Sequence, residues 1–266
     1  MLKRFFSQTA YILLMALWHP AYANAKSSAI SHTPSDYQIL ATAKHNPASF
    51  TQGWVKEGDT FYESSGLYGR SFISRYDTHA EVTFNLPRQY FAEGLTLLGN
   101  TLYLLTWKKG KLLLIDKRSL DITQEINYQG EGWGLTHNGQ QLIMSNGSNE
   151  LLFRHRQTFA IEKRLTVTGL KAINELEYVN GIIWANEWND DHIYGIHSET
   201  GCVLKKIDLS ALRQQTVRTP KSDNIVNGIA FDKVRNGLWV TGKFWPKRYL
   251  IALPTIQKSP THCQPR

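Results

Sequence analysis

Two sets of residues combine the side-chain types that acid–base chemistry on a small bound group requires. The first set stands directly before a recurring turn and consists of Gln52, Glu93, Trp133, Glu175 and Asn227. The second set lies at the end of the next strand and consists of Gly66, Trp107, Gly147, Trp188 and Lys243. Carboxyl groups transfer protons, N–H groups stabilise a developing oxyanion, and indole rings exclude water. If these residues converge, they form a pocket suited to proton-transfer chemistry.

The elements that carry these residues recur five times along the chain. Each repeat has a small-residue turn, an apolar residue, a Gly-containing hairpin and a Tyr- or Trp-rich strand. The repeats are QGWVKEGDTFYESSG (52–66), EGLTLLGNTLYLLTW (93–107), WGLTHNGQQLIMSNG (133–147), ELEYVNGIIWANEW (175–188) and NGIAFDKVRNGLWVTGK (227–243). They start about 40–45 residues apart, except for a longer last interval, and such a period is typical of propeller blades. The sequence therefore predicts an all-β fold, a five-bladed β-propeller; the alternative is a β-sandwich whose hairpins match by coincidence.

The repeats also indicate which positions support the scaffold. One apolar position stays alike in four repeats, at Leu102, Leu142, Ile183 and Leu238, whereas the two sets above vary among polar, charged and aromatic types. Because equivalent positions lie at one depth around the channel, we expect both sets to meet at one mouth of the propeller. We expect residues 37–43 to add a strand that closes the ring, and residues 213–223 to form a surface insertion.

The N-terminus has the order of a secretory signal. Lys3 and Arg4 precede an apolar run over residues 5–18, and small residues follow. We therefore expect a signal peptide over residues 1–25 and one propeller domain over residues 26–266. The mature protein would be exported, periplasmic or secreted, without stable membrane insertion; an uncleaved anchor is the alternative.

Composition narrows the classes of function further. The 266 residues are 42% apolar and 20% charged, which is ordinary for a globular protein. The net charge of +8 is spread along the chain without a basic block, so no nucleic-acid partner is expected. Cys202 and Cys263 suit an oxidising compartment, and we expect them to be bonded, with two free thiols as the alternative. The absence of a Cys/His cluster in the sequence disfavours a structural zinc site.

Nine motifs follow one another in the order in which a known enzyme family carries them. They are FTQG (50–53), ESSGLYGRS (63–71), FAEGLT (91–96), LTW (105–107), GEGWGLT (130–136), NELEY (174–178), ANEW (185–188), NGIA (227–230) and TGKFWP (241–246). Over residues 50–246 the chain resembles the glutaminyl-peptide cyclotransferases of the plant and bacterial type. The resemblance implies a five-bladed catalytic propeller, unrelated in fold to the zinc-dependent animal enzymes of the same activity. It also implies conversion of N-terminal glutaminyl residues of peptides or proteins to pyroglutamate, with release of ammonia.

The resemblance assigns roles residue by residue. Glu93 falls on the family's general acid/base, and the substrate pocket falls on Phe50, Gln52, Phe91, Trp107, Trp133, Asn174, Trp188 and Lys243. Two departures occur: Ala92 replaces a more usual Gly, and Asn146 stands where Asp is common. A structural calcium ion is compatible with the resemblance, although Asn146 would weaken a site that used a carboxylate there.

The implied reaction suits these side chains on chemical grounds. The α-amine attacks the γ-carboxamide carbon of its own side chain, so nucleophile and electrophile are already tethered. An α-amine with a pKa of about 7.7–8.0 is largely neutral near pH 8 and needs no metal for activation. Tryptophans around Glu93 should raise its pKa by removing water. The candidate oxyanion donors are Gln52, Asn174 and Lys243, and Glu175 is expected to contact the substrate ammonium or Lys243.

Two other functions remain open at this point. A non-catalytic propeller could bind a peptide or a glycan at the same mouth. A metal-dependent lactonase is disfavoured, because the first set contains only two carboxylates, Glu93 and Glu175. For the cyclotransferase we expect no catalytic metal or other cofactor, substrates with an N-terminal Gln as partners, and a monomer.

Overall fold

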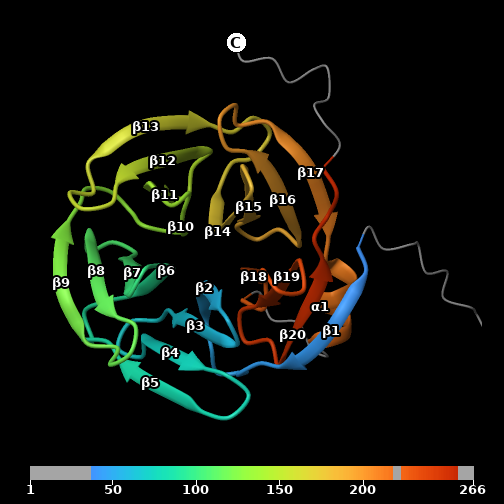
Figure 1. The fold of residues 1–266 in the computed structure, drawn as a ribbon, viewed down its shortest axis with the longest axis horizontal. Coiled ribbons are helices and arrows are strands. Elements are labelled where there is room, and N and C mark those ends of the chain that lie inside the picture. Colours follow the sequence, from blue (N-terminus) through green and yellow to red (C-terminus); the bar gives the residue numbers. More distant parts are fainter. Residues whose placement is uncertain (1–36, 218–222, 257–266) are drawn as a thin grey trace, which may run out of the picture. The chain divides into compact units, whose positions relative to one another are not determined.

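The strands of this protein are arranged as a five-bladed β-propeller. The computed structural model describes residues 37–217 and 223–256. Within these residues, the strands form five four-stranded antiparallel sheets. Figure 1 shows the sheets placed radially around a central axis, with β2, β6, β10, β14 and β18 innermost. The predicted fold class is confirmed.

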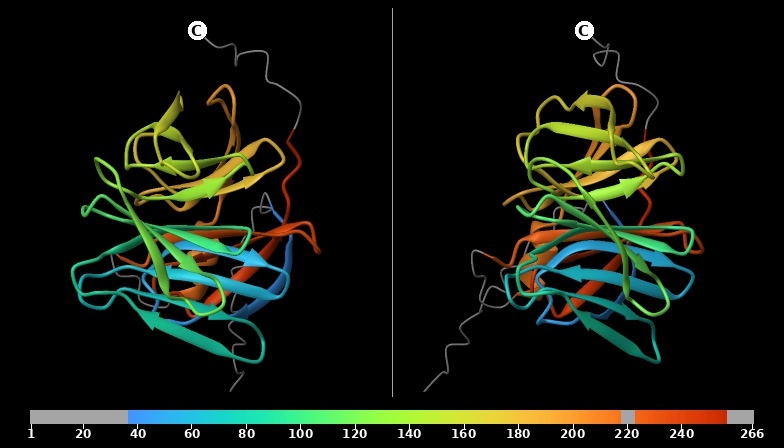
Figure 2. Two further views of the ribbon diagram at one scale, coloured as in Figure 1. Left: turned by 60° about the vertical axis from the view of Figure 1, so that its left-hand side comes forward. Right: turned by 90° about the vertical axis from the view of Figure 1, so that its left-hand side faces the viewer.

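Four blades are continuous in sequence and run from the axis outwards. Blade 1 contains β2 (Thr51–Glu57), β3 (Thr60–Ser65), β4 (Phe72–Tyr76) and β5 (Glu81–Asn85). Blade 2 contains β6 (Ala92–Leu98), β7 (Thr101–Thr106), β8 (Lys111–Asp116) and β9 (Ile122–Asn127). Blade 3 contains β10 (Leu135–His137), β11 (Gln141–Ser145), β12 (Glu150–His155) and β13 (Ile161–Thr166). Blade 4 contains β14 (Ile173–Val179), β15 (Ile182–Glu187), β16 (His192–His197) and β17 (Val203–Asp208). From the side, the outer strands of a blade are turned relative to its inner strands (Figure 2), as sheet twist requires.

The fifth blade is built from both ends of the propeller. It contains β18 (Val226–Asp232), β19 (Gly237–Gly242), β20 (Lys247–Ala252) and, outermost, β1 (Ile39–Lys44). β1 pairs antiparallel with β20, with Thr42 opposite Tyr249. In Figure 1, β1 (blue) lies beside β20 (red). The expected strand near residues 37–43 therefore closes the ring, as predicted.

Apolar packing joins each blade to the next. Among the described residues, each of five buried hydrophobic clusters draws its members from two neighbouring blades. The cluster between blades 5 and 1 is rich in aromatic rings and consists of Trp54, Phe61, Ala230, Trp239 and Leu250. Burial of such faces supplies most of the stability of a propeller ring.

The glycine of the repeat allows neighbouring inner strands to approach closely. A Cβ on Gly53 would lie 2.1 Å from the backbone nitrogen of Leu95, and one on Gly94 would lie 2.4 Å from that of Leu135. A Cβ on Gly134 would lie 1.9 Å from the carbonyl oxygen of Asn174. These contacts exclude any side chain, so the turn glycine is required by the packing around the channel.

Some expectations are corrected or lie outside the described part. Of the expected surface insertion over residues 213–223, residues 213–216 belong to helix α1 (Ser210–Thr216), in which Leu212 and Thr216 are buried, and residues 218–222 lie outside the described residues. The predicted signal peptide, residues 1–25, lies outside the described residues. So does Cys263, and its bond to Cys202 stays a prediction. The described part of the chain contains no helix with the length and hydrophobicity needed to cross a membrane.

Candidate active site

One mouth of the propeller contains a cavity of about 480 Å³. Its lining consists of Phe50, Gln52, Phe91, Glu93, Trp107, Trp133, Asn174, Trp188 and Lys243. These residues come from all five blades and are separated by up to almost 200 positions in the sequence. The structure thus brings together nine of the ten residues that the sequence indicated for the site.

Two structural features place these side chains at the mouth. The inner strands of blades 1, 2, 4 and 5 each have a register irregularity at the repeat position, which in blade 2 lies between Ala92 and Leu95. A β-bulge re-aims the side chains beside it, and Glu93 lies in this one. The second set follows directly after second strands: Trp107 after β7, Trp188 after β15 and Lys243 after β19.

Glu93 is the buried carboxyl group of the cavity. Its side chain accepts a hydrogen bond from Gln52, with 2.8 Å between Nε2 and Oε1, and the residue is only 4% exposed. Burial raises the pKa of Glu93 well above its usual range, and the negative charge of Glu131 adds to this; the positive charge of Lys243 and the Gln52 bond oppose it. Glu93 therefore holds a proton more tightly than a carboxyl group in water does.

Lys243 supplies a cation to the same cavity. Its Nζ lies 4.3 Å from the centroid of the Phe50 ring, a cation–π distance. Burial lowers the pKa of Lys243 to about 8, although the charges of Glu93 and Asp223 act in the opposite direction. The ammonium can therefore lose its charge within a few pH units of neutrality.

Aromatic rings form the walls of the cavity. Phe91 contacts Trp107 at 5.3 Å between ring centroids, and Trp133 contacts Trp188 edge-on at 6.4 Å. Trp188 is 55% exposed and marks the rim of the cavity, whereas Phe91 is buried. The walls can pack apolar methylenes and exclude water, with the titratable groups gathered among them.

Comparisons with known proteins agree with this geometry. The family model "Glutamine cyclotransferase" matches residues 11–253 of the chain. The chain belongs to the glutamine cyclotransferase family. A glutaminyl-peptide cyclotransferase from Arabidopsis thaliana is 33% identical over 257 residues, which cover 93% of this chain and 80% of the relative. The crystal structure of Myxococcus xanthus glutaminyl cyclase matches with a TM-score of 0.77 and 31% identity, covering 83% of this chain and 97% of that one.

Family membership decides between the classes of function left open by the sequence. The chain is an enzyme, a glutaminyl-peptide cyclotransferase, and not a non-catalytic binding propeller or a metal-dependent lactonase. Within the described residues, no group of three or more His, Cys, Asp or Glu side chains is placed to hold a metal ion. The Oδ1 of Asn146 accepts hydrogen bonds from Ser148 N at 3.2 Å and Ser148 Oγ at 2.6 Å, which stabilise a local turn.

The structure places Glu175 outside the lining of this cyclotransferase cavity. Its carboxylate accepts a hydrogen bond from the backbone N–H of Ile229 at 2.9 Å and another from the N–H of Trp54. Glu175 is buried and joins the inner strands of blades 5 and 1 across the channel. This placement does not support the expected contact of Glu175 with a substrate ammonium or with Lys243. Glu175 and Asn174 lie in one bulge, and only Asn174 lines the cavity.

Glu131 is a site residue that the sequence reasoning missed. Its Oε2 accepts hydrogen bonds from the indole N–H groups of Trp107, at 2.8 Å, and Trp133, at 3.0 Å. One carboxylate thus orients two walls of the cavity. A signal was present: Glu131 stands two residues before Trp133, the repeat position that Phe50 and Phe91 occupy in blades 1 and 2.

Proposed function

We propose that Glu93 shuttles the proton in the cyclisation of an N-terminal glutaminyl residue. The observation that supports this most strongly is a buried carboxyl group of raised pKa in an aromatic cavity large enough for one side chain. A general acid/base works best when its pKa lies near the working pH, and the environment of Glu93 shifts it in that direction.

The reaction requires one bond to form and one to break. The substrate α-nitrogen bonds to the γ-carboxamide carbon, and the carbon–nitrogen bond of the carboxamide breaks. Glu93 takes the proton that the α-nitrogen loses and delivers it to the departing nitrogen, which leaves as ammonia. Pyroglutamate remains, and Glu93 returns to its initial state. The cavity raises the rate by holding the cyclic conformer of a tethered pair.

Three polar neighbours complete the proposed mechanism. Gln52 orients the Glu93 carboxyl through its 2.8 Å hydrogen bond. Lys243 donates to the oxyanion that develops on the γ-oxygen, which an ammonium in a dry site stabilises strongly. The Oδ1 of Asn174 is buried without a hydrogen-bond partner among the described residues and can accept an N–H of the substrate.

The tryptophans determine how the substrate binds. The glutaminyl methylenes pack between the aromatic walls, and the following residues of the peptide leave past Trp188 at the rim. This arrangement suits a chain terminus and excludes internal glutamines, which have no free α-amine and cannot enter end-first.

One assay tests the proposed function. Purified enzyme is incubated with a short peptide that begins with Gln, and ammonia and pyroglutamyl peptide are measured with and without a chelator. We expect one ammonia per pyroglutamyl product, equal rates in chelator, and no reaction of the N-acetylated peptide. Activity that is lost in chelator and restored by zinc would contradict the metal-free mechanism.

We further propose that residues 1–25 are removed as a signal peptide and that the mature enzyme is an exported monomer, periplasmic or secreted. The order of charged, apolar and small residues in this segment supports the proposal. Mass spectrometry of the protein from each cell fraction would give the mature N-terminus, and sedimentation would give its oligomeric state. A retained leader, or a stable dimer, would contradict it.

A further inference from the structure

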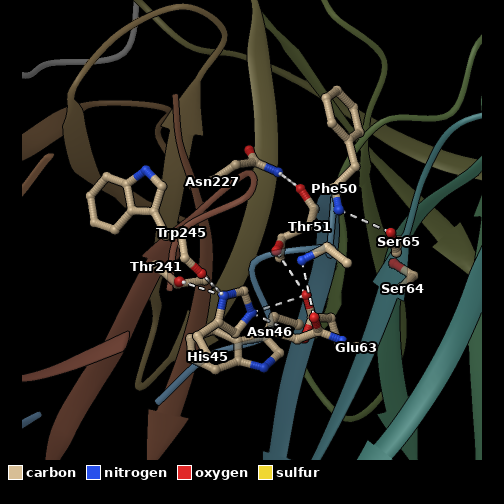
Figure 3. Close-up of polar contacts among 12 residues, drawn as sticks. His45, Asn46, Phe50, Thr51, Glu63, Ser64, Ser65, Asn227, Thr241 and Trp245 are labelled. Atoms are coloured by element: carbon tan, nitrogen blue, oxygen red, sulfur yellow. Dashed lines mark hydrogen bonds and ion pairs between the residues drawn. The ribbon is translucent and has the colours of Figure 1, made fainter. Parts of the chain in front are cut away.

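A buried ion pair lies where blade 1 meets blade 5. His45, which follows β1, and Glu63 on β3 contact each other, with 3.1 Å from Nε2 to each carboxylate oxygen. The other ring nitrogen of His45 lies 2.8 Å from the carbonyl oxygen of Trp245. Both nitrogens thus face acceptors, which only a doubly protonated imidazole satisfies. Figure 3 shows this ion pair between the two blades.

Glu63 also holds the strand that carries site residues. Its Oε1 accepts a hydrogen bond from Thr51 Oγ1 at 2.7 Å, and its Oε2 accepts one from Tyr76 at 3.1 Å. Thr51 stands between Phe50 and Gln52, both of which line the cavity. On its other side, the carbonyl of Thr51 accepts a hydrogen bond from Asn227 at 2.8 Å.

His45 holds the opposite segment in the same way. Trp245 stands two residues after Lys243, and Phe244 between them donates its backbone N–H to Ser49 at 2.8 Å. The segments 45–50 and 243–246 are therefore fixed to each other, and Lys243 lies against Phe50.

We propose that His45 and Glu63 are positioning residues of the active site, which hold Thr51 and Trp245 so that Phe50, Gln52 and Lys243 converge on the substrate. The proposal rests on the proposed function of the Glu93 cavity. The ion pair itself contacts none of the reacting atoms.

A second buried ion pair between the same two blades provides a matched control. Lys56 on β2 and Asp232 on β18 lie 3.3 Å apart, with side chains 5% and 1% exposed. Lys56 lies towards the far end of β2, five residues beyond Thr51 and away from the cavity. Its loss should weaken the ring without moving Phe50, Gln52 or Lys243.

The test compares Thr51→Val with Thr51→Ser. Val keeps the shape of Thr51 but removes the hydroxyl group that donates a hydrogen bond to Glu63. Ser retains that hydroxyl group. We expect Thr51→Val to lower kcat by about ten-fold or more, because small displacements of catalytic groups are costly. KM should stay nearly constant, since Trp107, Trp133 and Trp188 belong to blades 2 to 4. Thr51→Ser should restore kcat.

The remaining variants separate positioning from stability. His45→Gln should also lower kcat per folded molecule, whereas Lys56→Met should lower the melting temperature and leave kcat and KM unchanged. The proposal is overturned if Thr51→Val keeps its kcat, or if Lys56→Met loses as much kcat as His45→Gln. Wild type and Glu93→Gln are assayed alongside: an active Glu93→Gln would contradict the proposed function of Glu93, and the Thr51 comparison would still report on positioning.

Discussion

Glu93 and Lys243 occupy one small cavity, and burial shifts the pKa of each towards neutrality from opposite sides. A carboxyl that holds protons more tightly and an ammonium that releases them more readily are suited to chemistry near pH 8. The shifts have one physical origin, because aromatic walls replace water around both groups. Two predictions concern these residues.

The first prediction is that Glu93→Gln abolishes most turnover in a folded protein. Gln keeps the length and shape of Glu but cannot take up the amine proton, so kcat should fall by about 10²–10⁴-fold. Substrate affinity should change far less, because the tryptophan walls remain. Both the melting temperature and kcat are measured on one sample. A lower melting temperature with turnover nearly intact would assign Glu93 to the scaffold instead.

The second prediction concerns the pH profile. Lys243 is charged below its pKa of about 8 and neutral above it, while the substrate amine becomes neutral as the pH rises towards about 8. The rate should therefore pass through an optimum near pH 8 and fall on the basic side. Lys243→Arg should move the basic limb to higher pH, and Lys243→Met should be slow and lack that limb. A basic limb that persists in Lys243→Met would exclude Lys243 as its source.

At the scale of elements, the short segment before β10 orients two walls of the cavity. There, Glu131 accepts hydrogen bonds from the indole N–H groups of Trp107 and Trp133. Lys108 forms an ion pair with it, with 3.7 Å between Nζ and Oε1. We expect Glu131→Ala to raise KM several-fold, because each lost hydrogen bond costs about 1 kcal/mol, with a smaller change in kcat. Glu150→Ala, which removes an exposed ion pair with Arg164, is the control and should leave KM unchanged. Equal KM values for the two variants would show that the indoles do not need this anchor.

The alignment of the repeats marks the boundary of what the sequence could predict. The repeats predicted five blades, because the close packing of neighbouring inner strands keeps glycine at the turn in four of the five blades. The repeat positions that vary among polar, charged and aromatic residues predicted which residues meet at the mouth, since equivalent positions lie at one depth along the channel. Glu175 was misplaced because the repeats were aligned one residue out in blade 4: the backbone hydrogen bonds make Asn174 equivalent to Gln52 and Glu93, and Glu175 takes the position of the turn glycine. Helix α1 was missed because its polar sequence hides two buried residues, Leu212 and Thr216.

For the whole molecule, the closure between blades 1 and 5 should make stability depend on pH. The charge and hydrogen bond of Glu63 raise the pKa of His45 although burial and Arg248 oppose this, and His45 lowers the pKa of Glu63 against its own desolvation. A raised histidine pKa contributes stability fully below the unfolded value and loses it as the pH rises through the folded value. Stability should therefore decline as the pH rises from the unfolded histidine value of about 6.5 through the raised pKa of His45, and in acid as the pH falls through the lowered pKa of Glu63.

Urea midpoints measured across this pH range check the expectation. His45→Gln should be less stable than wild type, and its urea midpoint should no longer decline as the pH rises through the pKa of His45. Removing one partner of a buried ion pair typically costs about 3–5 kcal/mol. If the urea midpoint of His45→Gln falls with rising pH as steeply as that of wild type, a group other than His45 causes the decline.

The pairing of β1 with β20 also sets an order of events during synthesis and folding. The hydrogen bond from His45 to Trp245 spans 200 residues, so the first strand to be made must wait for the last before the ring can close. Contacts of such separation are slow to form, because the entropy of a long loop is lost before they stabilise anything. Until closure, the outer edge of β20 is open, and an open edge pairs with any extended chain nearby. In a crowded solution that chain can be β1 of a second copy, so refolding at high concentration should yield strand-exchanged assemblies where dilute refolding yields closed rings.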